Sequence, residues 1–240
     1  MGARALLLAS DQLSRQLAEL SFAPPIAHVY NPLEYARELW TDYLAKFGND
    51  SGQVLLLGMN PGPWGMAQTG VPFGAVAIVR DWLALQGNVQ PPASQHPRVP
   101  IEGLHCWRNE VSGERLWGWA RQRFGTPARF FEQFFVANYC PLCFLEPSGR
   151  NRTPDKLPRA ERQAVEAACD EHLRKVVDIL KPTLVVGVGQ YAEERARQAL
   201  AGRDVPVGRI LHPSPASPLA NKDWSGQAEA QLRALGLSLP

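Results

Sequence analysis

Four short, continuously apolar runs constrain the fold of this chain more than any other feature of its sequence. They cover residues 53–59, 134–137, 183–187 and 207–211. Strands that are covered on both faces of an α/β sheet have this uniform hydrophobicity. Helical patterns follow at about 75–86, 113–124, 158–180, 189–201 and 224–235. Strands alternating with helices predict an α/β fold, with a mostly parallel four-stranded central sheet that helices flank on both faces.

The N-terminal part of the chain is also predicted to be helical. Leucines at 6, 13, 17 and 20 recur on one helical face, and charged residues interrupt the apolar run too early for a signal peptide. Asn31 and Pro32 are typical of a helix start, and Gly48 of a helix end. We therefore predict a single domain over residues 1–240, in which residues 1–24 form a helical extension.

Composition excludes several classes of protein. Hydrophobic residues make up 45% of the chain and charged residues 20%, which is typical of a folded domain with a core. The net charge of +2 does not by itself indicate a nucleic-acid partner, which would need a local basic patch. No apolar run reaches the length of a transmembrane helix. We expect no membrane partner, a monomer, and a cytoplasmic protein (nucleoid-associated in a bacterium, nuclear in a eukaryote).

The four cysteines do not have the spacing of a metal site. Cys140 and Cys143 form a CxxC pair, but Cys106 and Cys169 lie far from it and from each other. Zinc sites normally use two close pairs, so reduced thiols are the expectation and no metal is predicted. An iron–sulfur cluster remains the alternative.

Polar residues follow the predicted strands at the edge where ligands of parallel sheets bind. Asn60, Asn138 and His212 each come directly after a strand. Residues 58–74 hold five glycines and three prolines, without the pattern of a P-loop or of a dinucleotide site. A rigid loop of backbone amides with one aromatic wall, Phe73, predicts a pocket for a flat, polar heterocycle. Residues 87–100, with four prolines, predict a long loop that is an interaction surface or a lid.

Two long segments resemble the signature motifs of one enzyme family. GMNPGPWGMAQTGVPFG at 58–74 and HPSPASPLANKDW at 212–224 are similar to those of the single-strand-selective monofunctional uracil-DNA glycosylases, and the resemblance runs from about residue 25. It implies an enzyme that flips uracil, and also 5-hydroxymethyluracil, out of DNA. The enzyme would hydrolyse the N-glycosidic bond without a cofactor and leave an abasic site. The implied partner is DNA containing uracil or oxidised or deaminated bases.

The resemblance also implies roles for individual residues. Asn60 would hold the attacking water, and His212 would support negative charge on the departing base. Asn138 would bind the edge of uracil, because one amide can accept from N3–H and donate to O4. Phe73 would stack on the base, while Met59 and Gly62 would add backbone contacts. The small Gly62 is expected to leave space for groups on C5 of the base.

The second motif implies the contacts to DNA. Ser214 and Lys222 are expected to meet phosphates. The family often has Arg at the position of Ala216, so Leu219 is the predicted apolar residue that fills the space left by the flipped base. Arginines between 98 and 129, and residues 149–153, could also touch DNA, although a solvated surface is the simpler interpretation. No lysine lies at the catalytic positions, as expected for an enzyme that does not cut the strand through a Schiff base.

Two alternative functions remain open. Substitutions around the pocket and the 213–224 loop would allow deaminated purines such as hypoxanthine or xanthine as substrates. A relative that binds DNA without catalysis would have the same motifs, and would differ in whether Asn60, Asn138 and His212 meet around one cavity.

Overall fold

Each of the four apolar runs forms one strand of a parallel sheet. The computed structural model describes residues 2–240. The strands are β2 (Val54–Gly58), β3 (Phe134–Asn138), β6 (Leu184–Val188) and β7 (Val207–Ile210), in the order β3-β2-β6-β7. All three pairings are parallel, and every residue of β2 and β6 is buried. The prediction of a parallel four-stranded sheet is confirmed.

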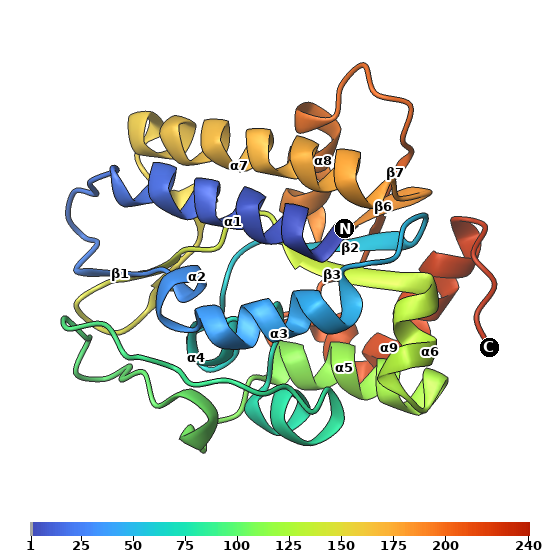
Figure 1. Cartoon of the computed structure of the whole chain (residues 1–240), viewed down its shortest axis with the longest axis horizontal. Coiled ribbons are helices and arrows are strands. Elements are labelled where there is room, and N and C mark those ends of the chain that lie inside the picture. The colour runs from blue at the N-terminus through green and yellow to red at the C-terminus, as the bar shows by residue number, and fades with distance from the viewer. Residues whose placement is uncertain (1) are drawn as a thin grey trace.

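Helices cover both faces of this sheet (Figure 1). On one side lie α1 (Gly2–Ala18), α7 (Arg159–Leu180) and α8 (Gln190–Ala199). On the other lie α3 (Arg37–Phe47), α5 (Val111–Phe124), α6 (Pro127–Gln133) and α9 (Pro218–Ala234). Two single helical turns, α2 (Pro32–Tyr35) and α4 (Met66–Thr69), complete the second side. In α1, Leu6, Leu13 and Leu17 are buried in the main core, as their spacing predicts, and the helix packs beside α7.

Four predicted helices have different bounds in the structure. The N-terminal helix ends at Ala18 instead of extending to 24, and the helix expected between Asn31 and Gly48 is interrupted at Ala36. The helix expected over 75–86 is helical only to Trp82, and its last turn, Ile78–Trp82, is a π-helix. Ala84 has a φ of 50°, which ends the helical path. The helix expected from 224 begins at Pro218, because the Ser217 side chain caps it by accepting from the backbone N–H of Ala220. Non-helical backbone at Asp223 separates the early part of α9 from the rest.

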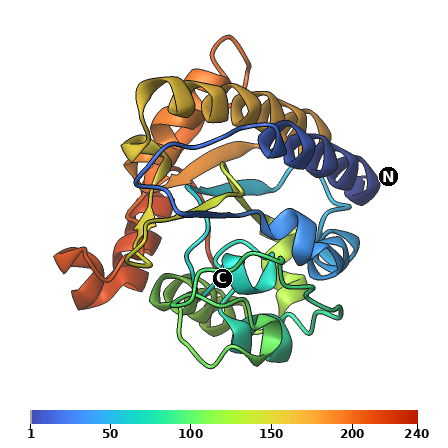
Figure 2. The ribbon, with the colours of Figure 1, turned by 90° about the vertical axis from the view of Figure 1, so that its left-hand side faces the viewer.

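A second, antiparallel sheet was not predicted from the sequence. It consists of β1 (His28–Tyr30), β4 (Cys143–Leu145) and β5 (Asn151–Arg152), in the order β1-β4-β5, and Figure 2 shows it beside the central sheet. Strands of two or three residues are too short to have a recognisable periodicity. The loop at 87–100 is tied to this region, since the Tyr30 hydroxyl donates to the carbonyl of Val99 and the backbone N–H of Gln90 donates to that of Tyr35.

The cysteines and charged side chains give no sign of a metal site in the described part of the chain. Cys106, Cys140, Cys143 and Cys169 are all buried and free. Between residues 2 and 240, no cluster of three or more His, Cys, Asp or Glu side chains has the arrangement of metal ligands. Over the same range, no helix combines the length and the apolar character needed to cross a bilayer.

Helix α8 packs closely on strand β6 at Gly187. A Cβ on Gly187 would lie 2.3 Å from the backbone nitrogen of Glu193 in α8. We expect Gly187→Ala to lower the free energy of unfolding by about 1–3 kcal/mol, because the helix must move away from the sheet. In α5, a Cβ on Gly118 would meet nothing within 4 Å. Gly118→Ala is therefore the control, and should raise stability by roughly 0.5–1 kcal/mol. Urea denaturation measures both values, and equal effects of the two substitutions would contradict this packing.

Candidate active site

The carboxyl ends of three parallel strands bring the predicted site residues together. Asn138 ends β3, and Asn60 and His212 come two residues after β2 and β7. All three line one cavity of about 240 Å³. The other three residues predicted to bind the base also line it: Met59, Gly62 and Phe73. The cavity is smaller than most sites for drug-sized ligands, so its volume suits a single small ring.

The amide of Asn60 is held in one orientation by the main chain. Its Nδ2 donates to the carbonyl of Leu142 at 3.1 Å and contacts that of Pro61 at 3.5 Å. Both partners are acceptors, so Nδ2 must be the atom that faces them. Oδ1 is consequently the part of the side chain that is left to accept a hydrogen bond at the cavity. An oriented acceptor of this kind can fix a water molecule.

Asn138 and Phe73 meet across Gly58, the last residue of β2. A Cβ on Gly58 would lie 2.2 Å from Oδ1 of Asn138 and 2.6 Å from the ring of Phe73. Gly58 pairs with Asn138 in the parallel register, so the two strands bring the amide directly beside the glycine. On its other side, Nδ2 of Asn138 donates to Sδ of Met66 at 3.1 Å. Only glycine at position 58 allows the ring and the amide to approach this closely.

The backbone of Phe73 has a strained conformation that neighbouring groups stabilise. Its φ is 54°, which is rare for an aromatic residue. Three contacts support this turn: Thr69 Oγ1 donates to the carbonyl of Gly74, Trp117 Nε1 donates to that of Pro72, and Gly113 in α5 allows the carbonyl of Phe73 to come close. The surrounding packing therefore holds the ring as one wall of the cavity, 6.1 Å from the ring of His212.

His212 is a partly buried imidazole that is neutral at physiological pH. Burial lowers the pKa of His212 to about 4. Gly189, with a φ of 100°, allows the turn after β6 to pass behind it, since a Cβ there would lie 3.1 Å from the Cβ of His212. A neutral ring can present one N–H to the cavity without carrying a positive charge.

Several residues to which the sequence analysis assigned no contact with the base also line the cavity. They are Pro63, Met66, Glu110, Ser112, Asn151, Thr153 and Pro215. Glu110 occupies the space beside the glycine-rich loop: a Cβ on Gly62 would lie 2.2 Å from its Oε2, and one on Gly65 would lie 2.7 Å from its Cγ. The missing side chain at Gly62 therefore makes room for a carboxyl group. Burial raises the pKa of Glu110, against the opposing effect of the backbone N–H groups of Trp64 and Ser112.

Asn151 is the second residue without a clear sequence signal. It lies in β5, and its Nδ2 donates to the carbonyl of Pro61 at 3.0 Å. The short antiparallel sheet thus supports the loop that carries Asn60. The only sequence signal at Asn151 is its place in the segment 149–153, for which a solvated surface is the simpler interpretation and a contact to DNA the alternative.

Hydrogen bonds from Arg115 hold the segment 213–224. The residues of this segment that are predicted to contact DNA differ in how exposed they are. Ser214 lines the cavity, whereas Ala216, Leu219 and Lys222 are exposed outside it. The guanidinium of Arg115 in α5 donates to the carbonyls of Pro213 and Ser214 and to Oδ1 of Asn221. Arg115 therefore holds this segment against the sheet rather than facing solvent.

Other arginines that could have contacted DNA are engaged within the molecule. Arg123 forms an ion pair with Glu229, and Arg152 with Glu146. Arg98 donates to the carbonyl of Ser148. These three side chains therefore join different segments of the fold.

Comparison with known proteins supports the family that the two sequence motifs resemble. A model of the uracil DNA glycosylase superfamily matches residues 45–233. Single-strand selective monofunctional uracil-DNA glycosylases of Rattus norvegicus, Mus musculus and Bos taurus are each 50% identical over 228 residues, which is 94% of this chain and 82–84% of the relatives. The crystal structure of wild-type Pedobacter heparinus SMUG2 has the same fold, with a TM-score of 0.67 at 20% identity over 96% of this chain and 99% of that one. The chain therefore belongs to the uracil DNA glycosylase superfamily, in the family of the single-strand selective monofunctional uracil-DNA glycosylases.

Proposed function

We propose that this protein removes uracil from DNA by hydrolysing the bond between N1 of the base and C1′ of deoxyribose. The observation that carries the proposal is the convergence of Asn60, Asn138, Phe73 and His212 around one cavity. Relatives at 50% identity are named for this reaction. A protein that only bound DNA would have no need for an oriented amide and a neutral imidazole in the same pocket. A monomer stays the expected active form.

Binding of the base follows from the two residues on either side of Gly58. The ring of Phe73 offers a flat surface on which a pyrimidine can stack. The amide of Asn138 can accept from N3–H and donate to O4 of uracil. Cytosine has an acceptor at N3 and a donor at the exocyclic position, so the same amide orientation would leave polar groups unpaired against it.

Bond cleavage uses His212 and Asn60. As the C1′–N1 bond breaks, its electron pair moves onto the base, and negative charge develops on O2. The N–H of neutral His212 would donate to that oxygen, which stabilises charge present only in the transition state. Oδ1 of Asn60 would hold the water whose oxygen bonds to C1′, and the proton released from the water passes to the departing base or to solvent.

We propose 5-hydroxymethyluracil as a second substrate, with Glu110 as the group that borders it. Gly62 has no side chain, but the carboxyl of Glu110 occupies the adjacent space. A hydroxyl group reaching this wall would find a hydrogen-bonding partner, whereas a methyl group would not. Release rates from oligonucleotides containing uracil, 5-hydroxymethyluracil, thymine, hypoxanthine or xanthine give the substrate range. Release of thymine as fast as 5-hydroxymethyluracil would contradict this selectivity.

The proposed reaction is tested with a uracil-containing oligonucleotide. Incubation with EDTA-treated protein, followed by alkali, should break the strand at the position of the uracil, since alkali cleaves abasic sites. An intact strand would exclude the proposed function.

Substitution of the two proposed catalytic residues should slow the reaction strongly. We expect Asn60→Ala and His212→Ala each to lower the single-turnover rate by about 10²-fold or more, which is the usual loss for one positioned transition-state contact. Leu8→Ala, on the exposed surface of α1, serves as the control and should retain the wild-type rate. Near-normal rates in the first two variants would remove their assigned roles.

The pKa of His212 predicts how stability depends on pH. Its folded value of about 4 lies below the ordinary value of 6.5, so the unfolded state binds more protons in this interval. Stability should fall as the pH drops from about 6.5 to about 4, by as much as roughly 3 kcal/mol for this residue. Burial also lowers the pKa of His172 to about 4, which adds a loss of the same sign.

The variant His212→Asn separates the two histidines. It should lose less stability than the wild type between pH 7 and pH 4.5, while it keeps the contribution of His172. Urea denaturation at both pH values measures the difference, and an identical pH dependence in the two proteins would show that His212 is not the buried neutral group described here.

A further inference from the structure

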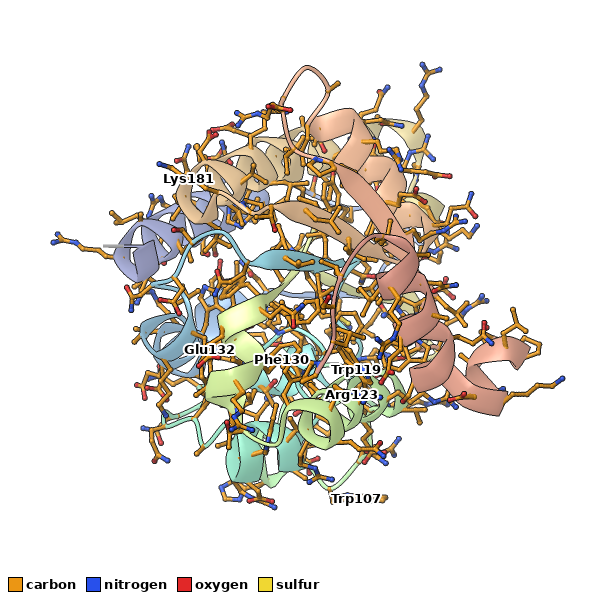
Figure 3. All side chains as sticks on the ribbon, turned by 90° about the vertical axis from the view of Figure 1, so that its right-hand side faces the viewer. Trp107, Trp119, Arg123, Phe130, Glu132 and Lys181 are labelled. Carbon is orange, nitrogen blue, oxygen red and sulfur yellow. The ribbon has the colours of Figure 1, made fainter. Side chains whose placement is uncertain are left out.

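Two tryptophans and an arginine form a stack on the surface beside the active site. The guanidinium of Arg108 lies 4.3 Å from the ring centroid of Trp64 and 5.5 Å from that of Trp107. Trp64 is partly buried and packs against the smaller apolar cluster, whereas Trp107 is 81% exposed. Figure 3 shows Trp107 at the outer edge of the molecule, away from the aromatic residues Trp119 and Phe130 of the core. One end of the stack, Trp64, is therefore anchored in the fold, and the other end, Trp107, is exposed to solvent.

The stack is continuous with the wall of the active-site cavity. Trp64 lies in the glycine-rich loop, directly after the cavity residue Pro63. Its backbone N–H donates a hydrogen bond to the carboxyl of Glu110. Glu110 lines the cavity and follows Arg108 by two residues. A strand whose flipped base occupied the cavity would place its neighbouring nucleotides next to this surface.

We propose that Trp64, Arg108 and Trp107 form a stacking platform for unpaired DNA bases that flank the flipped nucleotide. The inference rests on the proposed function, because it requires DNA at the cavity. Bases stack on exposed aromatic rings with little sequence preference, and each such contact contributes about 1–3 kcal/mol. In a duplex the bases are already stacked on each other, so a platform of this kind favours single strands.

The charges around the stack are compatible with a nucleic-acid strand. None of the ion pairs formed between residues 2 and 240 uses Arg108. A groove beside it is lined by Trp107, Arg108, Arg80, Arg121 and a single carboxylate residue, Glu114. Arg80 is paired with Asp81, whereas none of the ion pairs among residues 2–240 uses Arg121. Arg108 and Arg121 are thus free to neutralise phosphates next to the stacked bases.

The experiment measures the binding of single-stranded oligonucleotides by fluorescence anisotropy. The probes are about four or about sixteen nucleotides long and carry 2′-fluoro-2′-deoxyuridine, whose glycosidic bond resists hydrolysis. Trp107→Ala should raise the Kd of the long probe by about tenfold, and this ratio should shrink toward one for the short probe. With the uracil analogue near either end of the long probe, the increase in Kd should occur for one polarity only, because the platform lies on one side of the cavity.

Two further variants distinguish stacking from a structural effect. Trp107→Phe keeps an aromatic ring, so it should bind nearly as tightly as the wild type. It should also lose most of the tryptophan fluorescence quenching that the long probe causes. Leu8→Ala removes an exposed apolar side chain on α1 and should change neither quantity. A Kd for Trp107→Ala within about twofold of the wild type, or an equal increase for both polarities, would overturn the platform.

Two separate measurements test the proposed function and the stacking platform. Release of uracil from a natural oligonucleotide by the wild-type protein tests the function alone. Binding of the fluorinated probes by the Trp107 variants tests the platform, whatever the rate of uracil release.

Discussion

Parallel pairing of the central strands is the constraint on which the site depends. The pairing aligns Gly58 with Asn138 and Val188 with Ile210, so the strands end at one edge of the sheet. Asn60, Asn138 and His212 are separated by more than seventy residues from one another along the chain, yet their strands end within two residues of each of them. A slip in the register of β3 against β2 would remove the amide of Asn138 from Gly58. The chemistry of the pocket therefore follows directly from the hydrogen bonds of the sheet.

Glycines allow the groups in this pocket to approach closely. Gly58 admits the ring of Phe73 and the amide of Asn138, Gly62 and Gly65 admit the carboxyl of Glu110, and Gly113 admits the strained turn at Phe73. At each position a side chain would collide with an atom that forms or supports the cavity wall. Three of the five glycines of the first motif are thus explained by packing around the cavity, without any need for a phosphate-binding loop.

Burial shifts both titratable side chains of the cavity toward their uncharged forms. Burial lowers the pKa of His212, so the imidazole is neutral, and it raises the pKa of Glu110, so that carboxyl is a weaker acid than usual. The main chain supplies much of the remaining polarity: the carbonyl of Leu142 orients Asn60, and that of Pro61 is held by Asn151. Fixed dipoles in a small, partly enclosed site stabilise developing charge without first having to reorganise.

The sequence by itself determined the four strands of the central sheet and their alternation with helices along the chain, and it predicted that Asn60, Asn138 and His212 converge at one edge. These features follow from local patterns, since a buried strand is uniformly apolar and the residues after it lie at one edge. The assignment of Met59, Gly62 and the individual roles came from the resemblance of two motifs to a known family. The roles of those residues and of the DNA contacts at 214–222 stay predictions. Only the tertiary structure decided that Glu110 enters the pocket beside Gly62, that Arg115 holds the 213–221 segment, and that a second sheet supports Asn60. These contacts join segments far apart in the sequence, and no periodicity or turn signal records which distant side chain will occupy the space beside a glycine.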